Sequence, residues 1–271
     1  MNLAITDPGL EKFIIDDSNA SSFAAEVKDP NSPFNGGFNS DQVQQGFGSP
    51  FSRSIIPRRE WSDHIKRQEA EKSSPDHWRL RGGVPVLDQN GYGYCWCYGT
   101  VGAIMNAYAQ TGMQSPHLSA MGPAWQGKRG RNEGGWAGEA LGYIEKYGIP
   151  ELSVWPEHDK NVNPNDESVK RSAAMHGHVE TEELERNNFE ALVSALLDPE
   201  RPTACTIGLQ WWGHLIYATK AVEISPGKFG VKIVNSWKKS WGKDGCSVLA
   251  ENKAIAFEQI AVVRVKPRVA A

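Results

Sequence analysis

A cysteine at the expected start of a helix is the residue of this chain best suited to nucleophilic chemistry. Cys95 follows the segment Gln89-Asn90-Gly91-Tyr92-Gly93-Tyr94, and apolar residues at helical spacing predict a helix from Trp96 to Tyr108. A thiolate at a helix N-terminus is stabilised by the helix dipole, and pairing with a histidine lowers a thiol pKa to roughly 3–4. We therefore predict that Cys95 is a thiolate nucleophile with a depressed pKa.

A second residue of this segment suits acyl-transfer chemistry. Gln89 lies six residues before Cys95, and Gly91 and Gly93 allow the tight turn that returns its amide to the sulfur. An amide in that position donates a hydrogen bond to the oxyanion of a tetrahedral intermediate. We predict that Gln89 is this donor, and losing such a donor typically costs about 10²–10³ in rate.

A thiol nucleophile needs a base, and the chain has seven histidines. Only His214 opens an apolar, strand-like run, which leads to a turn at Ser225-Pro226-Gly227. A returning strand of alternating apolar residues, 229–233, then leads to Asn235. Folding this hairpin brings Asn235 opposite His214, where an asparagine accepts the imidazole N–H and fixes the tautomer that faces the thiol.

Over roughly residues 74–265 the chain resembles the papain-family (cathepsin-like) cysteine peptidases. Four separated motifs in the family's order carry the resemblance, and a Tyr147-Gly148-Ile149 segment follows an expected helix as it does in the family. The motifs are Pro75-Asp76-His77-Trp78-Arg79 with the run Val84-Pro85-Val86-Leu87-Asp88-Gln89 before Cys95, then Leu118-Ser119, then Gly134-Gly135, and finally Asn235-Ser236-Trp237-Lys238-Lys239-Ser240-Trp241-Gly242-Lys243-Asp244-Gly245.

The resemblance implies a role for each matching residue. Cys95 would be the nucleophile, His214 the base, Asn235 its orienting partner and Gln89 the oxyanion-hole side chain. The glycine pair would bind extended substrate through its backbone. Trp237 would shield the His–Asn hydrogen bond from water, and a specificity pocket with a neutral, apolar preference would be bordered by Trp136, Ala137 and Gly213.

The same resemblance implies an α+β, two-lobed papain-like fold with the cleft between the lobes. We expect residues 1–73 to form an extended N-terminal arm and residues 74–271 the peptidase domain. A helical lobe would span about 90–185 and an antiparallel sheet lobe about 200–265, including Cys246–Leu249 and Ile260–Val263 in its floor. A connecting helix is expected from Asn188-Phe189 to Leu197, ended by Asp198-Pro199.

Two departures from the family bear on the cleft and on the compartment. Tyr92 and Asn132 stand where the family has a disulfide, and of the four cysteines the three other than Cys95 cannot all pair. We therefore expect a reducing compartment, either the cytoplasm or a viral or phage particle. The sequence shows no secretory signal and no apolar run long enough to span a membrane, which agrees with this expectation. The short link from Leu209 to His214 predicts a trimmed leaving-group side of the cleft.

The arm is the part that the family does not explain. Residues 1–50 carry seven acidic and two basic side chains, a net charge of −5, and are too polar to fold alone. Single phenylalanines recur along it, which predicts an arm that lies along another surface. The arm would be either a pro-region or a segment bound to a protein partner, for example in a larger viral assembly. The phenylalanines are Phe13, Phe23, Phe34, Phe38, Phe47 and Phe51. Charges interleaved over residues 52–73 predict a solvated helix.

Other interpretations of these residues remain open. A cysteine at a helix start is often a small, buried hydrophobic residue. The Cys95-x-Cys97 and His176-x-His178 pairs could also be interpreted as a zinc site. However, alternate residues diverge on a helix, and the spacing matches no standard zinc finger. We expect no metal and no organic cofactor. A net charge of −3 and a pI near 6.2 give no reason to expect a nucleic acid or an acidic membrane as partner.

Three functions follow from these residues. The first is a cysteine-type endopeptidase that hydrolyses peptide bonds through a thioacyl-enzyme, with a peptide or protein as substrate. The second is a structural or assembly protein, for example a component of a phage or viral particle, that uses a papain-like domain as a scaffold and docks through its arm. The third is another thiol amidase, such as a peptidoglycan or isopeptide hydrolase, which the Asn-Ser-Trp block favours less.

Overall fold

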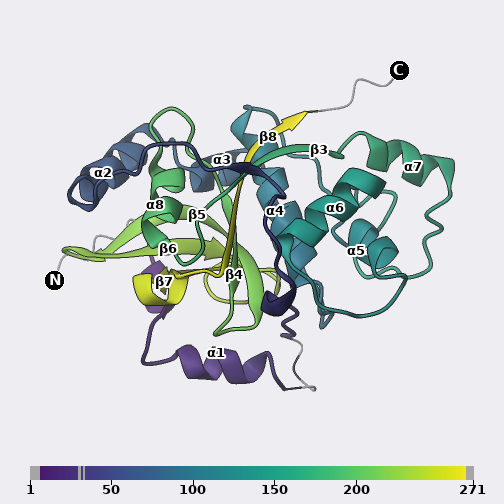
Figure 1. The fold of residues 1–271 in the computed structure, drawn as a ribbon, viewed down its shortest axis with the longest axis horizontal. Coiled ribbons are helices and arrows are strands. Elements are labelled where there is room, and N and C mark those ends of the chain that lie inside the picture. Colours follow the sequence, from purple (N-terminus) through teal and green to yellow (C-terminus); the bar gives the residue numbers. More distant parts are fainter. Residues whose placement is uncertain (1–6, 30–31, 33, 267–271) are drawn as a thin grey trace.

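The computed structural model describes residues 7–29, 32 and 34–266, and these form two lobes that meet along one long helix (Figure 1). The expected α+β papain-like class is confirmed. The helical lobe consists of α4 (Cys95–Gln110), α5 (Met121–Gly127), α6 (Ala137–Tyr147) and α7 (Glu167–Ala174). The other lobe is built on a sheet. No helix among the described residues is both long and apolar enough to cross a membrane.

Helix α4 joins the lobes because small residues let its backbone approach strand β5 (His214–Ser225). A Cβ atom on Gly99 would lie 2.7 Å from the Leu215 side chain, and one on Gly102 would lie 2.5 Å from the Tyr217 ring. Larger side chains would therefore push the helix off the sheet. This close approach brings the N-terminal end of α4 to the start of β5, so the first residue of the helix lies beside the first residues of the strand.

The sheet has the strand order β1-β7-β6-β5-β4-β8-β3-β2. Its central part is antiparallel and contains β3 (His178–Glu183), β4 (Cys205–Leu209), β5, β6 (Lys228–Val234), β7 (Cys246–Ala250) and β8 (Glu258–Lys266). The predicted hairpin is confirmed, since Tyr217 pairs with Val234 and the chain turns at 225–227. His214 and Asn235 therefore lie at the same end of two neighbouring strands.

The connecting helix also forms as predicted. Helix α8 (Phe189–Leu197) begins after Asn188, whose side-chain oxygen accepts a hydrogen bond from the Ala191 backbone N–H at 2.9 Å. This capping bond satisfies one of the N–H groups that every helix start leaves unpaired. The helix packs against β5, and a short helix, α9 (Glu251–Ala254), completes this lobe.

The arm supplies both edge strands of the sheet. Strand β1 (Ile14–Ile15) lies parallel to β7, and β2 (Ser49–Pro50) lies parallel to β3. Helix α1 (Ala20–Glu26) follows β1 at the lower end of the molecule, and the chain then passes between the two lobes beside α4 (Figure 1). The surface along which the described part of the arm lies therefore belongs to the same chain.

Three of the arm's six phenylalanines anchor it on aromatic partners. Ring centroids are 5.8 Å apart for Phe23 and Trp212, 5.0 Å for Phe34 and Trp237, and 4.6 Å for Phe47 and Trp136. Phe38 is buried, Phe51 lies under the guanidinium of Arg53, and Phe13 is 37% exposed. Such pairs contribute about 0.5–1.5 kcal/mol each beyond the area they bury, so spaced aromatics hold a segment that has no core of its own.

The prediction of a solvated helix over 52–73 was wrong in part. Helix α2 (Trp61–Glu71) forms, but one of its faces is buried against α8 and β5. Trp61 is fully buried between Phe189 and Phe229, and its indole N–H donates to the carbonyl oxygen of Ile56 at 2.8 Å. The interleaved charges of this helix concealed the helical spacing of Trp61, Ile65 and Gln68.

A buried group of charges joins the arm to helix α3 (Pro75–Arg81). The ammonium of Lys232 lies 2.6 Å from Asp7 and 2.7 Å from Asp76, and Arg79 lies 2.9 Å from Asp76. Burial opposes ionisation of Asp76, yet Arg79 and Lys232 hold the pKa of this carboxyl well below its usual value. The cluster therefore stays ionised, and each member depends on the others for compensation.

Truncation of Trp61 should destabilise the whole molecule, because its ring fills the core between α8 and the sheet. We expect Trp61→Ala to lower the free energy of unfolding by about 3–5 kcal/mol in urea titrations. Ile55→Ala, at a side chain that is 45% exposed, is the matched control and should cost under about 1 kcal/mol. A loss below about 1 kcal/mol for Trp61→Ala would mean that α2 is not part of the core.

Candidate active site

Cys95 is the first residue of α4, and its side chain is completely buried. The backbone N–H groups of Leu215 and Trp96 face its sulfur, but burial dominates and raises the pKa of the thiol to about 12. The predicted depressed pKa is therefore wrong for this structure. Here the thiol is neutral, because loss of water outweighs the helix terminus.

His214 faces Asn235 as the sequence predicts. Its Nε2 lies 2.8 Å from the Asn235 side-chain oxygen, which also accepts the Ser236 backbone N–H at 2.8 Å. Because that oxygen accepts only, we assign the imidazole hydrogen to Nε2, which leaves a lone pair on Nδ1. Nδ1 is buried and has no hydrogen-bond partner among the described residues. This nitrogen is the one available to take a proton.

The thiol and the imidazole are contributed by opposite lobes. The sulfur of Cys95 lies against the backbone N–H of Leu215, the residue that follows His214. No hydrogen bond joins the two side chains in this closed arrangement. Burial lowers the pKa of His214 to about 4, although the bond to Asn235 favours the protonated ring. Cys95 and His214 are therefore both neutral and shielded from solvent.

Aromatic rings enclose the imidazole. Trp237 stacks on His214 with ring centroids 4.4 Å apart and planes 28° apart, and Trp212 approaches the ring edge-on at 5.1 Å. Trp237 and Trp212 also contact each other at 5.5 Å. These rings exclude water from the hydrogen bond between His214 and Asn235. The bond is stronger as a result, because a hydrogen bond gains strength in a medium of low dielectric constant.

The Gln89 amide is held at both ends. Its Oε1 accepts the hydroxyl of Ser236 at 2.6 Å, and its Nε2 donates to the carbonyl oxygen of Tyr92 at 2.6 Å and to that of Asn35 at 2.7 Å. Ser236 thus fixes which end of the amide faces the cleft. One of the two carbonyl groups that accept from Nε2, that of Asn35, belongs to the arm.

Residues 34–48, called the strap below, occupy the groove between the lobes. The backbone N–H of Gly135 donates to the carbonyl of Gly37 at 2.8 Å, and the carbonyl of Gly135 accepts from Asn39 at 2.9 Å. On the other wall, the carbonyl of Gly213 accepts from Gly37 at 3.0 Å and from Phe38 at 3.1 Å. The strap runs parallel to the Gly135 segment, as an extra strand-like peptide.

Every residue predicted to bind peptide contacts the strap. Gly135 and Gly213 bond to its backbone, Trp136 packs on Phe47, and Trp237 packs on Phe34. A Cβ atom on Gly134 would lie 2.5 Å from the Gly37 carbonyl oxygen, so only glycine admits the strap at this distance. The structure thus brings together the predicted groove around a peptide of the chain itself.

A polar connection stands where the family has a disulfide. The side-chain oxygen of Asn132 accepts the Gly93 backbone N–H at 2.7 Å, and the Tyr94 hydroxyl donates to the Arg131 carbonyl at 2.7 Å. Tyr92 stacks on Tyr94 at 5.4 Å. These bonds tie the segment before Cys95 to the Gly134-Gly135 loop. All four cysteines of the chain lie within the described residues as free, buried thiols.

Two residues of the site escaped the sequence analysis. Ser236 lies in the Asn-Ser-Trp block, and that motif was the available signal. Glu258 accepts the backbone N–H groups of Ala137 and Gly138 at 2.9 and 3.0 Å, which fixes the start of α6 beside Trp136. Burial raises the pKa of Glu258 to about 7. No local pattern marks this residue, because its role depends on strand pairing with Gly208.

The residues considered for zinc have other partners. His176 contacts the Tyr108 hydroxyl at 3.0 Å and Glu151 at 3.4 Å, and the Cys97 thiol donates to the Ala120 carbonyl at 3.3 Å. Within the part of the chain that the structure describes, no three His, Cys, Asp or Glu side chains gather in a way that would hold a metal ion.

The depressed pKa of His214 predicts acid sensitivity. In the unfolded chain the His214 imidazole binds a proton near pH 6.5, whereas in the folded protein it does so only near pH 4. The folded state is therefore destabilised relative to the unfolded state as the pH falls from 6.5 toward 4. The loss at pH 4.5 is about 2 kcal/mol. His214→Gln should therefore lose less stability than the wild type between pH 7.5 and 4.5 in urea titrations.

The exposed His117 offers a matched control for this measurement. His117→Gln should follow the wild type across the same pH range. Equal acid sensitivity of the His214→Gln variant and the wild type would contradict the buried, neutral imidazole.

The fold was compared with those of known proteins. A scan against protein-family models and a search of curated proteins gave no match. Among solved structures, digestive procathepsin L 3 of Tenebrio molitor larval midgut has a TM-score of 0.62 at 17% identity, over 90% of this chain and 88% of that one. Bromelain from Ananas comosus, in complex with E64, has 0.56 at 21%, over 69% and 97%. A recombinant stem bromelain precursor has 0.54 at 14%, over 95% of both. The chain therefore has the papain-like fold.

Proposed function

We propose that the protein is a latent cysteine-type endopeptidase that hydrolyses peptide bonds through a thioacyl-enzyme. One observation carries this proposal. An extended peptide, the strap, lies in the groove between the lobes, bonded to Gly135 and Gly213, with its Asn35 carbonyl on the Gln89 amide. A groove that binds one peptide backbone in this way is suited to bind another when the strap leaves.

The proposed reaction proceeds in the following steps. His214 takes the proton of Cys95 on Nδ1, and the thiolate attacks the peptide carbonyl carbon. Gln89 donates to the oxyanion that forms. The imidazolium then gives its proton to the leaving amine, and His214 next deprotonates a water that hydrolyses the thioester. Throughout, the bond from Nε2 to Asn235 holds the ring and leaves Nδ1 to exchange the proton.

The strap keeps this machinery in its resting form. Water has no access to Cys95 or His214, which are both 0% exposed, and their pKa values favour the neutral thiol and the neutral ring. Departure of the strap would rehydrate the pair and allow the thiolate–imidazolium form. The likeness to proforms supports an inhibitory arm, because procathepsin L 3 matches 90% of this chain and bromelain 69%.

The substrate class follows from what fits the groove. The glycine pair admits a peptide backbone at close range, and Phe38 places its ring where a Cβ atom on Gly208 would lie 2.4 Å from it. Phe38 itself is only 7% exposed. We expect substrates to be extended peptides with an apolar side chain at the position that Phe38 occupies.

The catalytic roles predict a simple pattern of labelling and turnover. An epoxide that alkylates active-site thiols should label Cys95 once the groove is open, and Cys95→Ala should abolish both labelling and peptide hydrolysis. His214→Ala should abolish hydrolysis, and Gln89→Ala should reduce kcat/KM about 10²–10³-fold. Intact-mass spectrometry measures the labelling, and a fluorogenic peptide library measures the hydrolysis. His117→Ala is the control, and hydrolysis that survives in Cys95→Ala would rule out the proposal.

Expulsion of the strap should unmask the thiol. Gly37 has a φ of +151°, and a Cβ atom there would lie 2.2 Å from the Gly93 carbonyl oxygen, so Gly37→Val cannot keep the strap in place. We expect at least about tenfold faster labelling of Cys95, which corresponds to about 1.4 kcal/mol in favour of the open form. Gln44→Ala, at an exposed strap position, should label like the wild type. Equal rates for all three would show that the strap does not control access.

A further inference from the structure

We propose that the arm is a permanent part of this peptidase and that opening is confined to the strap, while the segments on both sides of it stay docked. This inference rests on the proposed function. It concerns residues 7–27, called the first anchor, residues 49–73, called the second anchor, and the strap that lies between them. A segment that only blocked the groove would need neither anchor.

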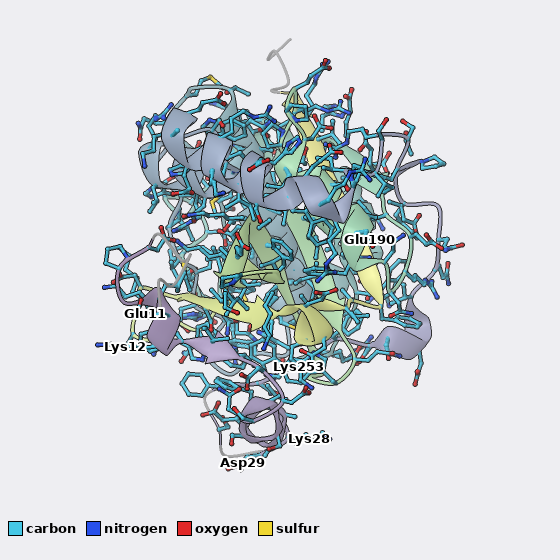
Figure 2. All side chains as sticks on the ribbon, turned by 90° about the vertical axis from the view of Figure 1, so that its left-hand side faces the viewer. Glu11, Lys12, Lys28, Asp29, Glu190 and Lys253 are labelled. Atoms are coloured by element: carbon cyan, nitrogen blue, oxygen red, sulfur yellow. The ribbon has the colours of Figure 1, made fainter. Side chains whose placement is uncertain are left out.

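The first anchor is built into the sheet. Strand β1 extends β7, and the Val248 backbone N–H donates to the Phe13 carbonyl at 3.0 Å. Leu10 and Ile15 are each only 1% exposed and belong to the two core clusters of the molecule. Asp17, just beyond β1, pairs with Lys253 at 2.6 Å. Figure 2 shows Lys253 above α1, and Lys28 and Asp29, which follow that helix in the chain, beside and below it.

The second anchor is more deeply embedded. Phe51 donates its backbone N–H to the Glu183 carbonyl at 3.0 Å, which prolongs the pairing of β2. The Arg53 side chain is 10% exposed and lies 2.9 Å from Glu182 and 3.4 Å from Asp198. Farther on, Ile56 and Gln68 bond to α8, through the Ser194 hydroxyl at 2.9 Å and the Leu196 carbonyl at 2.9 Å. Helix α2 thus lies against α8 as an ordinary core helix.

Buried lysines of the sheet tie both anchors to the peptidase domain. Lys220 on β5 and Lys232 on β6 have side chains only 4% and 8% exposed. Asp7 of the first anchor lies 2.6 Å from Lys232, and Glu69 of the second lies 2.6 Å from Lys220. Taking one member from a buried ion pair is strongly destabilising, because the remaining charge stays out of water. Loss of the arm would therefore remove two carboxylates that the sheet requires.

The strap differs from both anchors. Of its residues only Gly36 and Phe38 are buried, and the stretch 41–46 is exposed except for Val43. It holds the groove mainly through backbone bonds to Gly135 and Gly213 and through single aromatic contacts. Segments with few buried apolar side chains open at lower free energy than the core around them. The strap is therefore the part of the arm that opens first.

The position of the anchors sets the form of this opening. They lie at opposite edges of the sheet, β1 beside β7 and β2 beside β3, so the strap crosses the groove from one edge to the other (Figure 1). A chain held at both ends leaves the groove by bulging outward. A cut within the strap frees two short ends, whereas a cut after the second anchor leaves the strap in place.

Two full-length variants with one engineered cleavage site each test this inference. A recognition sequence for an unrelated serine protease is inserted after Gln44, in the strap, or after Lys72, behind the second anchor; both positions are exposed. After complete cleavage, the fragments of both variants should co-elute in size-exclusion chromatography. Epoxide labelling of Cys95 should rise about tenfold or more after the strap cut and stay at the uncut level after the cut at Lys72.

The opposite result has a clear form. Release of residues 1–72 after the Lys72 cut, together with faster labelling, would overturn the inference and leave the peptidase intact. Fragments that co-elute after the strap cut without faster labelling, when Gly37→Val does label, would also overturn it. Absence of labelling in every variant would contradict the proposed function instead, and co-elution would still decide whether the anchors stay docked.

Discussion

The close approach of α4 to β5 is the contact on which the site depends. Gly99 and Gly102 leave room for the side chains of Leu215 and Tyr217, and this places the first residue of the helix beside the first residues of the strand. Because of it, Cys95 of one lobe lies at the start of the strand that carries His214 in the other. The hairpin adds Asn235 at the same end, and Ser236 sets the direction of the Gln89 amide.

The strap gives this site two properties at once. As a peptide, it demonstrates the pairing that the groove offers, with one wall contributed by Gly135 and the other by Gly213. In the proposed latent state the strap is also the cover of the groove, in which burial keeps Cys95 and His214 neutral. Under this proposal one segment controls both access and protonation, and parts of the arm that belong to the core hold it at both ends.

Much of the fold and most of the site could be predicted from sequence, because the signals were local. Alternating apolar residues marked the hairpin, an asparagine cap and a following Asp-Pro marked α8, and glycines marked the turn before Cys95. The spaced phenylalanines correctly indicated an arm that lies along a surface. In each case a few neighbouring residues determine the local structure, whatever the rest of the chain does.

The features that escaped prediction depend on partners distant in the chain. Strands β1 and β2 have two residues each, too few for any periodicity, and exist only because β7 and β3 offer open edges. The raised pKa of Cys95 depends on its burial between the two lobes, which no local pattern around the residue reveals. Glu258 acts through a strand register, and the buried face of α2 was hidden among charges.

A crystal structure of the protein after reaction with a thiol-directed epoxide tests the central claim most directly. We predict the inhibitor joined to the Cys95 sulfur and lying along Gly135 and Gly213, with residues 34–39 displaced while Ile14–Ile15 still pairs with Val248–Leu249. An unmodified Cys95 beneath an unmoved strap in crystals of the treated protein, or an inhibitor attached to another residue, would contradict the account.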